Sequence, residues 1–157
     1  TSFTTSQILI DNRNSGSSAS GFNCYIDTNN TLKFRIKGVD LPVSTSSLSV
    51  DTWFHLALTY DGVNKRIYFN GSNVATASES RTLSVTNNMR IGVASHTTPT
   101  NSFFSGDIDE VAIWSRALGS SEIQRIYNAT ANNVEKTANL FTSGLDNSLV
   151  YWNRMGD

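Results

Sequence analysis

The stretch that decides the fold is TWFHLALTYDG, residues 52–62. Its larger apolar side chains, those of Phe54, Leu56, Leu58 and Tyr60, stand on alternate positions. A period of two is the period of a β-strand, so these four side chains share one face and are predicted to be core. We also predict burial for apolar residues of later β-type runs, namely Ile67, Phe69, Ile91, Val111 and Ile113. The stretch ends in Asp-Gly, a dipeptide that reaches positive φ at little cost and therefore favours a hairpin turn.

A second turn dipeptide, Asn70-Gly71, follows the β-type run Ile67-Tyr68-Phe69. Two successive hairpin turns predict three consecutive antiparallel strands between Trp53 and about Thr76. Other short β-type runs, bounded by turn residues, recur along the chain at the spacing of an all-β sandwich. They are Gln7–Asp11, Phe22–Ile26, Leu32–Lys37, Arg66–Asn70, Met89–Val93 and Asp107–Trp114.

One segment is predicted to be a helix. Ser120 or Ser121 supplies an N-cap, Glu122 suits the first turn, and apolar residues return at helical spacing until about Asn128. Residues 129–148 are rich in Asn, Thr and Ala and show weak periodicity, which predicts a linker. The strand-like run that follows this linker is Leu149-Val150-Tyr151-Trp152.

Composition limits the expected partners and compartment. The chain has 157 residues, the size of one domain, with a net charge of -1 and 16% charged residues. Such a surface does not attract a phosphate backbone, so nucleic acid is not an expected partner. No apolar run approaches the ~20 residues that span a bilayer, so membrane insertion is not expected either. The single cysteine, Cys24, has no internal disulfide partner and is predicted to be a small buried hydrophobe. The many Ser, Thr and Asn residues suit an extracellular or virion exterior.

Several of these runs, taken in order, resemble a known family. They are residues 52–62, then KRIYFNG at 65–71, then Arg90-Ile91-Gly92, then FSGDIDEVAIWSRAL at 104–118, and then Glu122-Ile123 with Ile126-Tyr127. Over residues 7–128 the chain is similar to the laminin-G-like branch of the concanavalin A-like lectin and glucanase superfamily. The resemblance implies a jelly-roll sandwich of two antiparallel sheets in residues 1–128, with the short helix on its flank.

The ends of the chain depart from the pattern of this family. The resemblance implies an opening strand beside the strand matched by Ile108–Trp114, yet no such strand precedes the first run. Residues 149–157 are similar to that opening strand but follow the helix. Two explanations remain open: these residues begin a following module of a longer polypeptide, or they are a permuted strand that returns to the vacant edge. Their closing part, WNRMGD, is also similar to module openings in structural proteins of phages.

The residues needed for catalysis do not occur in a suitable pattern. A glycosidase needs two carboxylates that flank the scissile bond. Asp107, Asp109 and Glu110 come closest, but strand alternation sends Glu110 to the opposite face from the other two. His55 and His96 have neither a nucleophile motif nor zinc-ligand spacing beside them. The chain is therefore predicted not to be an enzyme.

A calcium site and a sugar site are the remaining candidates. The resemblance implies that some relatives hold a structural calcium ion with the residue matched by Asp109, whose alternative role is a hydrogen bond to backbone amides. Sugar binding is expected at two long polar loops, residues 12–20 and 95–104, because binding concentrates in long loops on a rigid sandwich. The alternative for each is a variable loop without a ligand. The candidate ligand-binding residues are Asn12, Asn14, His96, Thr98, Asn101 and Phe103. The aromatic residues expected in the core or in strand pairs, rather than as sugar platforms, are Trp53, Tyr60 and Trp114.

These observations predict a non-catalytic, lectin-like module for recognition or assembly within a larger extracellular, cell-surface or virion protein. The expected partners are a carbohydrate or protein surface and the neighbouring modules or subunits. Two alternatives remain: a purely structural virion or fibre component without a ligand, and a relative of the glycoside hydrolases. Fold alone does not decide among them, because one fold hosts many functions.

Overall fold

The computed structural model describes residues 4–14, 20–46, 51–84, 88–95, 102–131, 139–141 and 144–154. These residues form antiparallel β-strands and one α-helix, so the prediction of an all-β fold with a short helix is confirmed. No helix in this described part of the chain has both the length and the apolar character needed to cross a membrane. The chain forms two compact units, Thr1–Thr52 with Glu79–Gly106 and Trp53–Ser78 with Asp107–Asp157.

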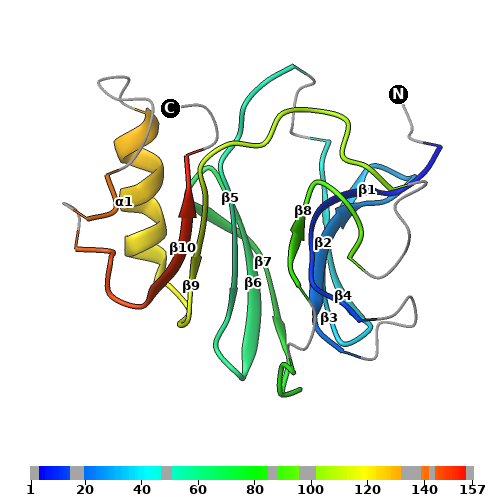
Figure 1. The fold of residues 1–157 in the computed structure, drawn as a ribbon, viewed down its shortest axis with the longest axis horizontal. Coiled ribbons are helices and arrows are strands. Elements are labelled where there is room, and N and C mark those ends of the chain that lie inside the picture. The colour runs from blue at the N-terminus through cyan, green and yellow to red at the C-terminus, as the bar shows by residue number, and fades with distance from the viewer. Residues whose placement is uncertain are drawn as a thin grey trace. The chain divides into compact units, whose positions relative to one another are not determined.

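The first unit is built on a five-stranded antiparallel sheet in the order β4-β3-β2-β1-β8 (Figure 1). Its strands are β1 (Gln7–Asp11), β2 (Phe22–Ile26), β3 (Thr31–Ile36), β4 (Val39–Ser44) and β8 (Arg90–Ile91). Strands β1 and β2 have the predicted bounds, and β3 lies one residue earlier than predicted. Strand β8 is shorter than the predicted run because Gly92, with a φ of 73°, leaves the extended conformation.

One face of this sheet is apolar, because residues that pair across neighbouring strands on this face all have apolar side chains. Cys24 pairs with Phe34, which pairs with Leu41, and all three are buried. Leu32 and Ile36, two residues to either side of Phe34, are completely buried. Each such side chain contributes about 1.5–3 kcal/mol relative to an exposed one. Burial raises the pKa of the Cys24 thiol, which fits its predicted role as a small buried hydrophobe.

Strand β4 is absent from the sequence prediction. It is joined to β3 by the turn Lys37-Gly38, whose residues have φ values of 43° and 84°. This is the geometry of a tight hairpin turn, but lysine is not among the residues that favour it. Pro42 also argues against a strand, because it cannot donate a ladder hydrogen bond. Proline is tolerated here because β4 is the last strand in the order of the sheet.

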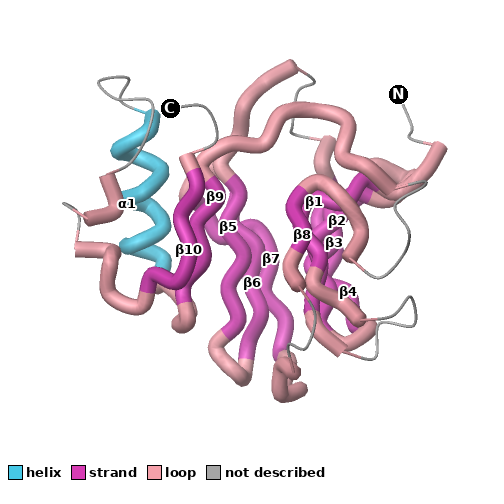
Figure 2. Tube along the Cα trace, viewed as in Figure 1, coloured by secondary structure: helices cyan, strands magenta, loops and turns pink. Residues whose placement is uncertain are grey.

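The second unit contains the predicted meander and the helix (Figure 2). Strands β5 (Leu56–Tyr60), β6 (Asn64–Phe69) and β7 (Ser72–Ser78) form a three-stranded sheet in that order. Strand β9 (Val111–Trp114) pairs with β10 (Leu149–Asn153). The three consecutive hairpin-connected strands predicted from the turn dipeptides are therefore confirmed.

The turn residues behave as their chemistry predicts. Asn70 and Gly71 have φ values of 47° and 78°, which a tight hairpin turn requires. The side-chain oxygen Oδ1 of Asp61 accepts the N–H groups of Val63 and Asn64, at 2.9 and 2.6 Å. This is an Asx-turn, in which the side chain takes the place of a backbone acceptor.

Helix α1 spans Ser120–Ala131, and its N-cap lies one residue before the earlier of the two predicted positions. The carbonyl of Gly119 accepts the N–H of Glu122, and the Glu122 carboxylate in turn accepts the Gly119 N–H at 2.8 Å. Gly119 is therefore the N-cap, and Glu122 at the third helical position supplies one half of a capping box, so the prediction of Ser120 or Ser121 as the N-cap is wrong. The helix also continues past Asn128 to Ala131. Near its start, Ile123 anchors it by packing with Tyr68 and Leu118.

The burial of the predicted core is mixed. Ile67 and Phe69 are buried, whereas Phe54, Leu56, Leu58, Ile91, Val111 and Ile113 are only partly buried. The expectation that Trp53 packs in the core or a strand pair is wrong, because its side chain is 67% exposed. It precedes β5, so no neighbouring strand pairs with it. The run predicted from Asp107 starts as a strand only at Val111, because Glu110 has a φ of 53°.

The predicted linker contains part of a core. Leu140 and Leu145 are buried and pack against Trp114 and Trp152, and Trp114 Nε1 donates a hydrogen bond of 2.7 Å to the Leu145 carbonyl. This part of residues 129–148 therefore packs, which weak hydrophobic periodicity did not indicate. The assignment of residues 149–157 to a following module or to a permuted strand stays a prediction, although β10 pairs with β9.

Candidate binding site

The candidate site begins with an irregularity in β1. Ile8 and Ile10 pair with consecutive residues of β2, so Leu9 between them is the extra residue of a β-bulge. In a regular strand Asp11 would lie on the apolar face of the sheet, because side chains alternate strictly. The bulge reverses this alternation and places Asp11 opposite Asn23, on the polar face.

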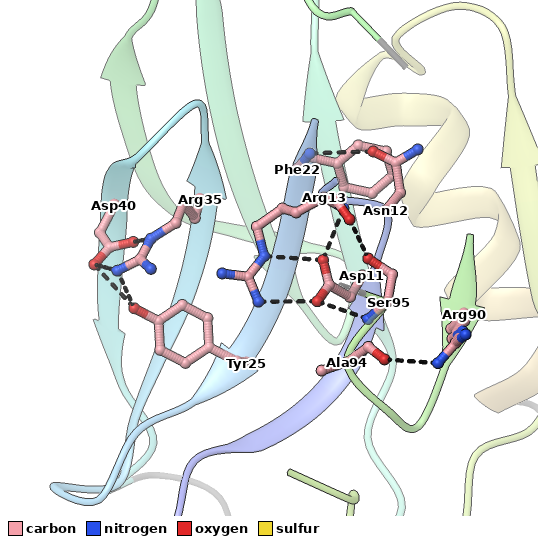
Figure 3. A network of polar contacts seen from close by, with 10 residues as sticks. All are labelled: Asp11, Asn12, Arg13, Phe22, Tyr25, Arg35, Asp40, Arg90, Ala94 and Ser95. Carbon is pink, nitrogen blue, oxygen red and sulfur yellow. Dashed lines mark hydrogen bonds and ion pairs between the residues drawn. The ribbon is translucent and has the colours of Figure 1, made fainter. Parts of the chain in front are cut away.

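Asp11 is the centre of a buried hydrogen-bond network (Figure 3). Arg13 binds both of its oxygens, with Nε 2.9 Å from Oδ1 and Nη2 2.9 Å from Oδ2. The backbone N–H of Arg13 donates to Oδ1 at 2.9 Å, and the N–H of Ser95 donates to Oδ2 at 3.1 Å. Asp11 is completely buried and Arg13 is 6% exposed. A buried ion pair needs such additional hydrogen bonds to offset the loss of hydration.

The network keeps Asp11 ionised. Burial alone would raise the pKa of Asp11, but the hydrogen bonds from Arg13 and Ser95 outweigh it and lower the pKa below the ordinary value of 3.8. At neutral pH the carboxylate therefore neutralises the Arg13 guanidinium. A carboxylate with a lowered pKa holds a proton weakly, so Asp11 serves as a negatively charged partner in the structure and not as a proton donor.

The same network joins the stems of the two long polar loops. The first loop, residues 12–21, connects β1 to β2, and the second, residues 93–103, follows β8. The hydroxyl of Ser95, in the second loop, donates a hydrogen bond of 2.6 Å to the Arg13 carbonyl in the first. Arg90 Nη1 donates to the Ala94 carbonyl at 3.3 Å and further fixes this stem (Figure 3). The two loops predicted to bind a ligand therefore start side by side.

Asn12 and Gly21 close the first loop. Asn12 donates its N–H to the Phe22 carbonyl at 3.0 Å, and its side-chain oxygen accepts the Phe22 N–H at 3.2 Å. Gly21 has a φ of 70°, and a Cβ there would lie 2.6 Å from Asn12 Oδ1 and 2.7 Å from the Asn12 carbonyl oxygen. Both the conformation and the close approach require glycine at this position.

The second loop is fixed to β1 at both ends. The Gly92 N–H donates to the Leu9 carbonyl at 2.8 Å, and the Phe104 N–H donates to the Gly92 carbonyl at 2.9 Å. The Ser105 N–H donates to Gln7 Oε1 at 2.6 Å. Phe103, just inside this closure, is 54% exposed.

The structure separates the predicted ligand-binding residues into three groups. Asn14 and Phe103 are exposed at the stems, and Asn14 Oδ1 accepts the Ser20 hydroxyl. Asn12 is 3% exposed, and its side chain closes the first loop. His96, Thr98 and Asn101 lie outside the described residues.

Sequence reasoning missed Asp11, Arg13 and Ser95. The available signal is the pair of opposite charges directly after an apolar strand and before a loop. In a chain with only 16% charged residues, such a pair is informative. Ser95 carries no comparable signal, because it is 84 positions from Asp11 in the sequence.

A second ion pair lies on the same polar face (Figure 3). Arg35 donates to both oxygens of Asp40, from Nε at 2.6 Å and from Nη2 at 2.8 Å, and its Cζ lies 4.9 Å from the centre of the Tyr25 ring. Burial and the negative charge of Asp40 raise the pKa of Tyr25 to about 12, so its phenol stays protonated and donates to Asp40. Asn23, between the two ion pairs in the strand register, is 1% exposed, and its side-chain oxygen has no hydrogen-bond partner within the described residues.

Comparison with known proteins gives the family. A family model described as the concanavalin A-like lectin/glucanases superfamily matches residues 1–124. The chain belongs to this superfamily. No curated protein matches the chain. A solved structure of an S-layer domain-containing protein (residues 221–444) from Clostridium thermocellum is 26% identical, with a TM-score of 0.43, and the match covers 80% of this chain and 64% of that chain. This chain thus spans slightly less than two thirds of that one.

The match confirms the resemblance to laminin-G-like members of the superfamily, and antiparallel sheets with one helix agree with its sandwich fold. The superfamily also includes glucanases, and glycosidases use a pair of carboxylates, for which the acidic residues before β9 are the candidates. Asp107 and Asp109 are exposed, whereas Glu110 accepts a hydrogen bond of 2.9 Å from Trp152 Nε1 and lies 3.4 Å from Arg154 Nε. Because all three precede β9, they lack the regular alternation by which a strand presents two carboxylates to one side.

The calcium expectation rests on Asp109. Its Oδ1 accepts the Glu110 N–H at 2.8 Å, which is the alternative role expected from the sequence. Calcium takes six to eight oxygen ligands, several of them carboxylates. Within the described ranges no group of three His, Cys, Asp or Glu side chains is placed to hold a metal. The described residues therefore do not by themselves assemble such a site around Asp109.

Proposed function

We propose that the chain is a non-catalytic recognition module of an extracellular or cell-surface protein, and that it binds carbohydrate through the two polar loops. One observation carries this proposal: Asp11, Arg13 and Ser95 hold the stems of both loops together in a buried network. Buried, fully bonded residues at the loop stems support the exposed stem residues beside them, Asn14 and Phe103. A fixed polar surface loses less entropy when a ligand binds.

The exposed residues at the stems suit a neutral sugar. Phe103 offers an aromatic ring for the apolar face of a saccharide, and Asn14 offers an amide that both donates and accepts hydrogen bonds. The two ion pairs contribute no net charge, because Asp11 is paired with Arg13 and Asp40 with Arg35. Arg90, whose Nη1 donates to the Ala94 carbonyl, adds one positive charge at the second stem, so the array includes sulfated sugars beside neutral ones.

Binding of the full chain to an array of neutral and sulfated polysaccharides, followed by calorimetry of the ligands found, tests this proposal. Phe103→Ala should weaken binding about two- to tenfold, the range expected for one aromatic contact. Phe141→Ala is the matched control, since Phe141 is 64% exposed and lies in the other unit. Equal effects of the two variants, or binding to nothing on the array, would refute a sugar site at Phe103. Release of reducing sugar would refute the non-catalytic reading.

Assembly with neighbouring subunits is the second candidate. It is favoured by the edge of the β9–β10 pair, where Val150 and Tyr151 are 68% and 38% exposed. Unpaired edges with apolar side chains promote association. Light scattering on the same preparations distinguishes the two functions: a monomer that binds sugar supports recognition, and an oligomer without sugar binding supports assembly.

A further inference from the structure

His55 lies beneath helix α1 in the second unit. Its ring centre is 6.0 Å from that of Tyr127 on the helix. Its N–H donates to Asn70 Oδ1, and its carbonyl accepts the Asn70 N–H, both at 2.9 Å. The backbone of His55 is thus fixed to the β6–β7 turn, which leaves the imidazole directed at the helix.

Helix α1 packs closely against the β6–β7 turn. A Cβ atom at Gly71 would lie 3.0 Å from Cδ1 and 3.2 Å from Cβ of Tyr127. Farther along the interface, Ile123 packs with Tyr68 and Leu118. Tyr127 therefore contacts both His55 and the turn, and the helix cannot leave the turn without uncovering the imidazole.

The buried ring nitrogen of His55 has no hydrogen-bond partner among the residues that the structure describes. Nδ1 is shielded from solvent and makes no hydrogen bond within the described residues. A neutral imidazole carries its proton on one of the two ring nitrogens, and in either tautomer an unpaired Nδ1 costs a moderate amount of free energy. In the imidazolium cation both nitrogens carry an N–H, so Nδ1 becomes a charged donor without an acceptor, which is far more costly.

Among the described residues, the groups around the imidazole offer no unpaired negative charge. On α1, Glu122 is held by Arg116 at 2.7 Å, and Arg125 is exposed. Tyr127 contributes its ring. On the turn, Asn70 is uncharged. On β6, Tyr68 and Arg66 share one face because they are two residues apart: the Tyr68 hydroxyl lies 3.4 Å from Ser120 Oγ, and Arg66 is paired with Asp61 at 2.7 Å. His55 is half-buried, and protonation is favoured where its shielded Nδ1 can also reach water.

We propose that His55 is a pH-sensitive latch, which holds helix α1 on the β6–β7 turn while the imidazole is neutral and releases the helix when it is protonated. Burial lowers the pKa of His55 below the ordinary value of 6.5, as this geometry requires. The docked form thus binds the proton more weakly than the released form. Docking is complete above the ordinary pKa and is lost as the pH falls through the docked value, by up to about tenfold in the docking equilibrium per pH unit.

Hydrogen–deuterium exchange of the full chain between pH 8 and pH 5, corrected for intrinsic rates, tests the latch. We expect the protection of α1 amides to fall by up to about tenfold per pH unit below the ordinary histidine pKa, while β6 amides keep theirs. His55→Gln, which stays uncharged, should abolish this pH dependence, and His96→Gln, at the other histidine, should preserve it. Parallel loss in α1 and β6, or an unchanged pH profile in His55→Gln, would overturn the proposal. If His55→Gln does not fold, His55→Phe gives the same test, because it fills the site with an uncharged ring.

Discussion

Replacing Asp11 with alanine tests the network that joins the two loops. The variant leaves the Arg13 guanidinium without its carboxylate, and that side chain is only 7% exposed. It also removes the acceptor of the Ser95 N–H and of the Arg13 N–H. A buried charge whose partner has been removed costs about 3–5 kcal/mol of folding free energy. For a chain of 157 residues, at about 2–4 °C per kcal/mol, the melting temperature should fall by about 6–20 °C.

A double variant distinguishes the cost of the unpaired Arg13 charge from the cost of removing the Asp11 side chain itself. Asp11→Ala combined with Arg13→Leu removes both charges, and replacement of a whole buried pair by apolar residues is often neutral or stabilising. The double variant should therefore recover most of the stability lost by Asp11→Ala alone. Asp146→Ala is the surface control, because Asp146 is exposed and its side chain makes no hydrogen bond in the described part of the chain. It should leave the melting temperature unchanged.

The assay is urea unfolding at several pH values, followed by tryptophan fluorescence. The pKa of Asp11 is lowered in the folded state, so its stabilisation is present above the ordinary value of 3.8 and is lost as the pH falls through the lowered value. The difference between wild type and Asp11→Ala should therefore shrink in strong acid. A loss below about 1 kcal/mol at neutral pH, the size of a surface ion pair, would refute the reasoning. So would a double variant that is no more stable than the single one.

Two further predictions concern single positions. Gly21→Ala should destabilise the chain more than Gly62→Ala in thermal melts: both residues have positive φ, but only Gly21 has backbone within 3 Å of the added Cβ, whereas nothing lies within 4 Å at Gly62. Equal losses, each near the about 1–2 kcal/mol of positive-φ strain alone, would show that Asn12 moves aside easily. Asp109→Asn should lower the melting temperature only in the presence of calcium if Asp109 is a ligand, because a ligand stabilises the state it binds. Equal loss with and without a chelator would assign Asp109 to its hydrogen bond with Glu110.

Local sequence signals predicted the parts of the fold that depend on neighbouring residues. The turn dipeptides at Asp61 and Asn70 gave the meander, since their chemistry acts over two or three positions. Helical spacing gave α1, although the cap was misplaced because the Glu122 side chain reaches back to Gly119. The hairpin at Lys37 was missed because a lysine adopts the conformation normally left to glycine or asparagine.

The site depended on contacts that no local signal contains. The bulge at Leu9 determines on which face of the sheet Asp11 lies. The run of apolar residues in β1 gives no sign of this bulge, because an apolar run shows no alternation that an extra residue could interrupt. The loops were predicted from their length and polarity, but Asn12 was expected to meet a ligand and is instead buried in the closure of its own loop. Asn14 and Phe103 are exposed, as a binding role needs, and that role stays a prediction.

The position of the charges explains how one stem arrangement can serve different ligands. Asp11 and Arg13 are buried in the stems and satisfy each other, so the fold of the stems depends little on the residues beyond them. The sequence between the stems is largely Ser, Thr and Asn, residues that hydrogen-bond without carrying charge. If the loops bind a ligand as proposed, exchange of these residues alters which hydroxyl or amide meets it, while the paired charges keep the two stems together. On the proposed function, recognition and stability belong to different residues of the same loops, and the buried ion pair of Asp11 and Arg13 serves stability.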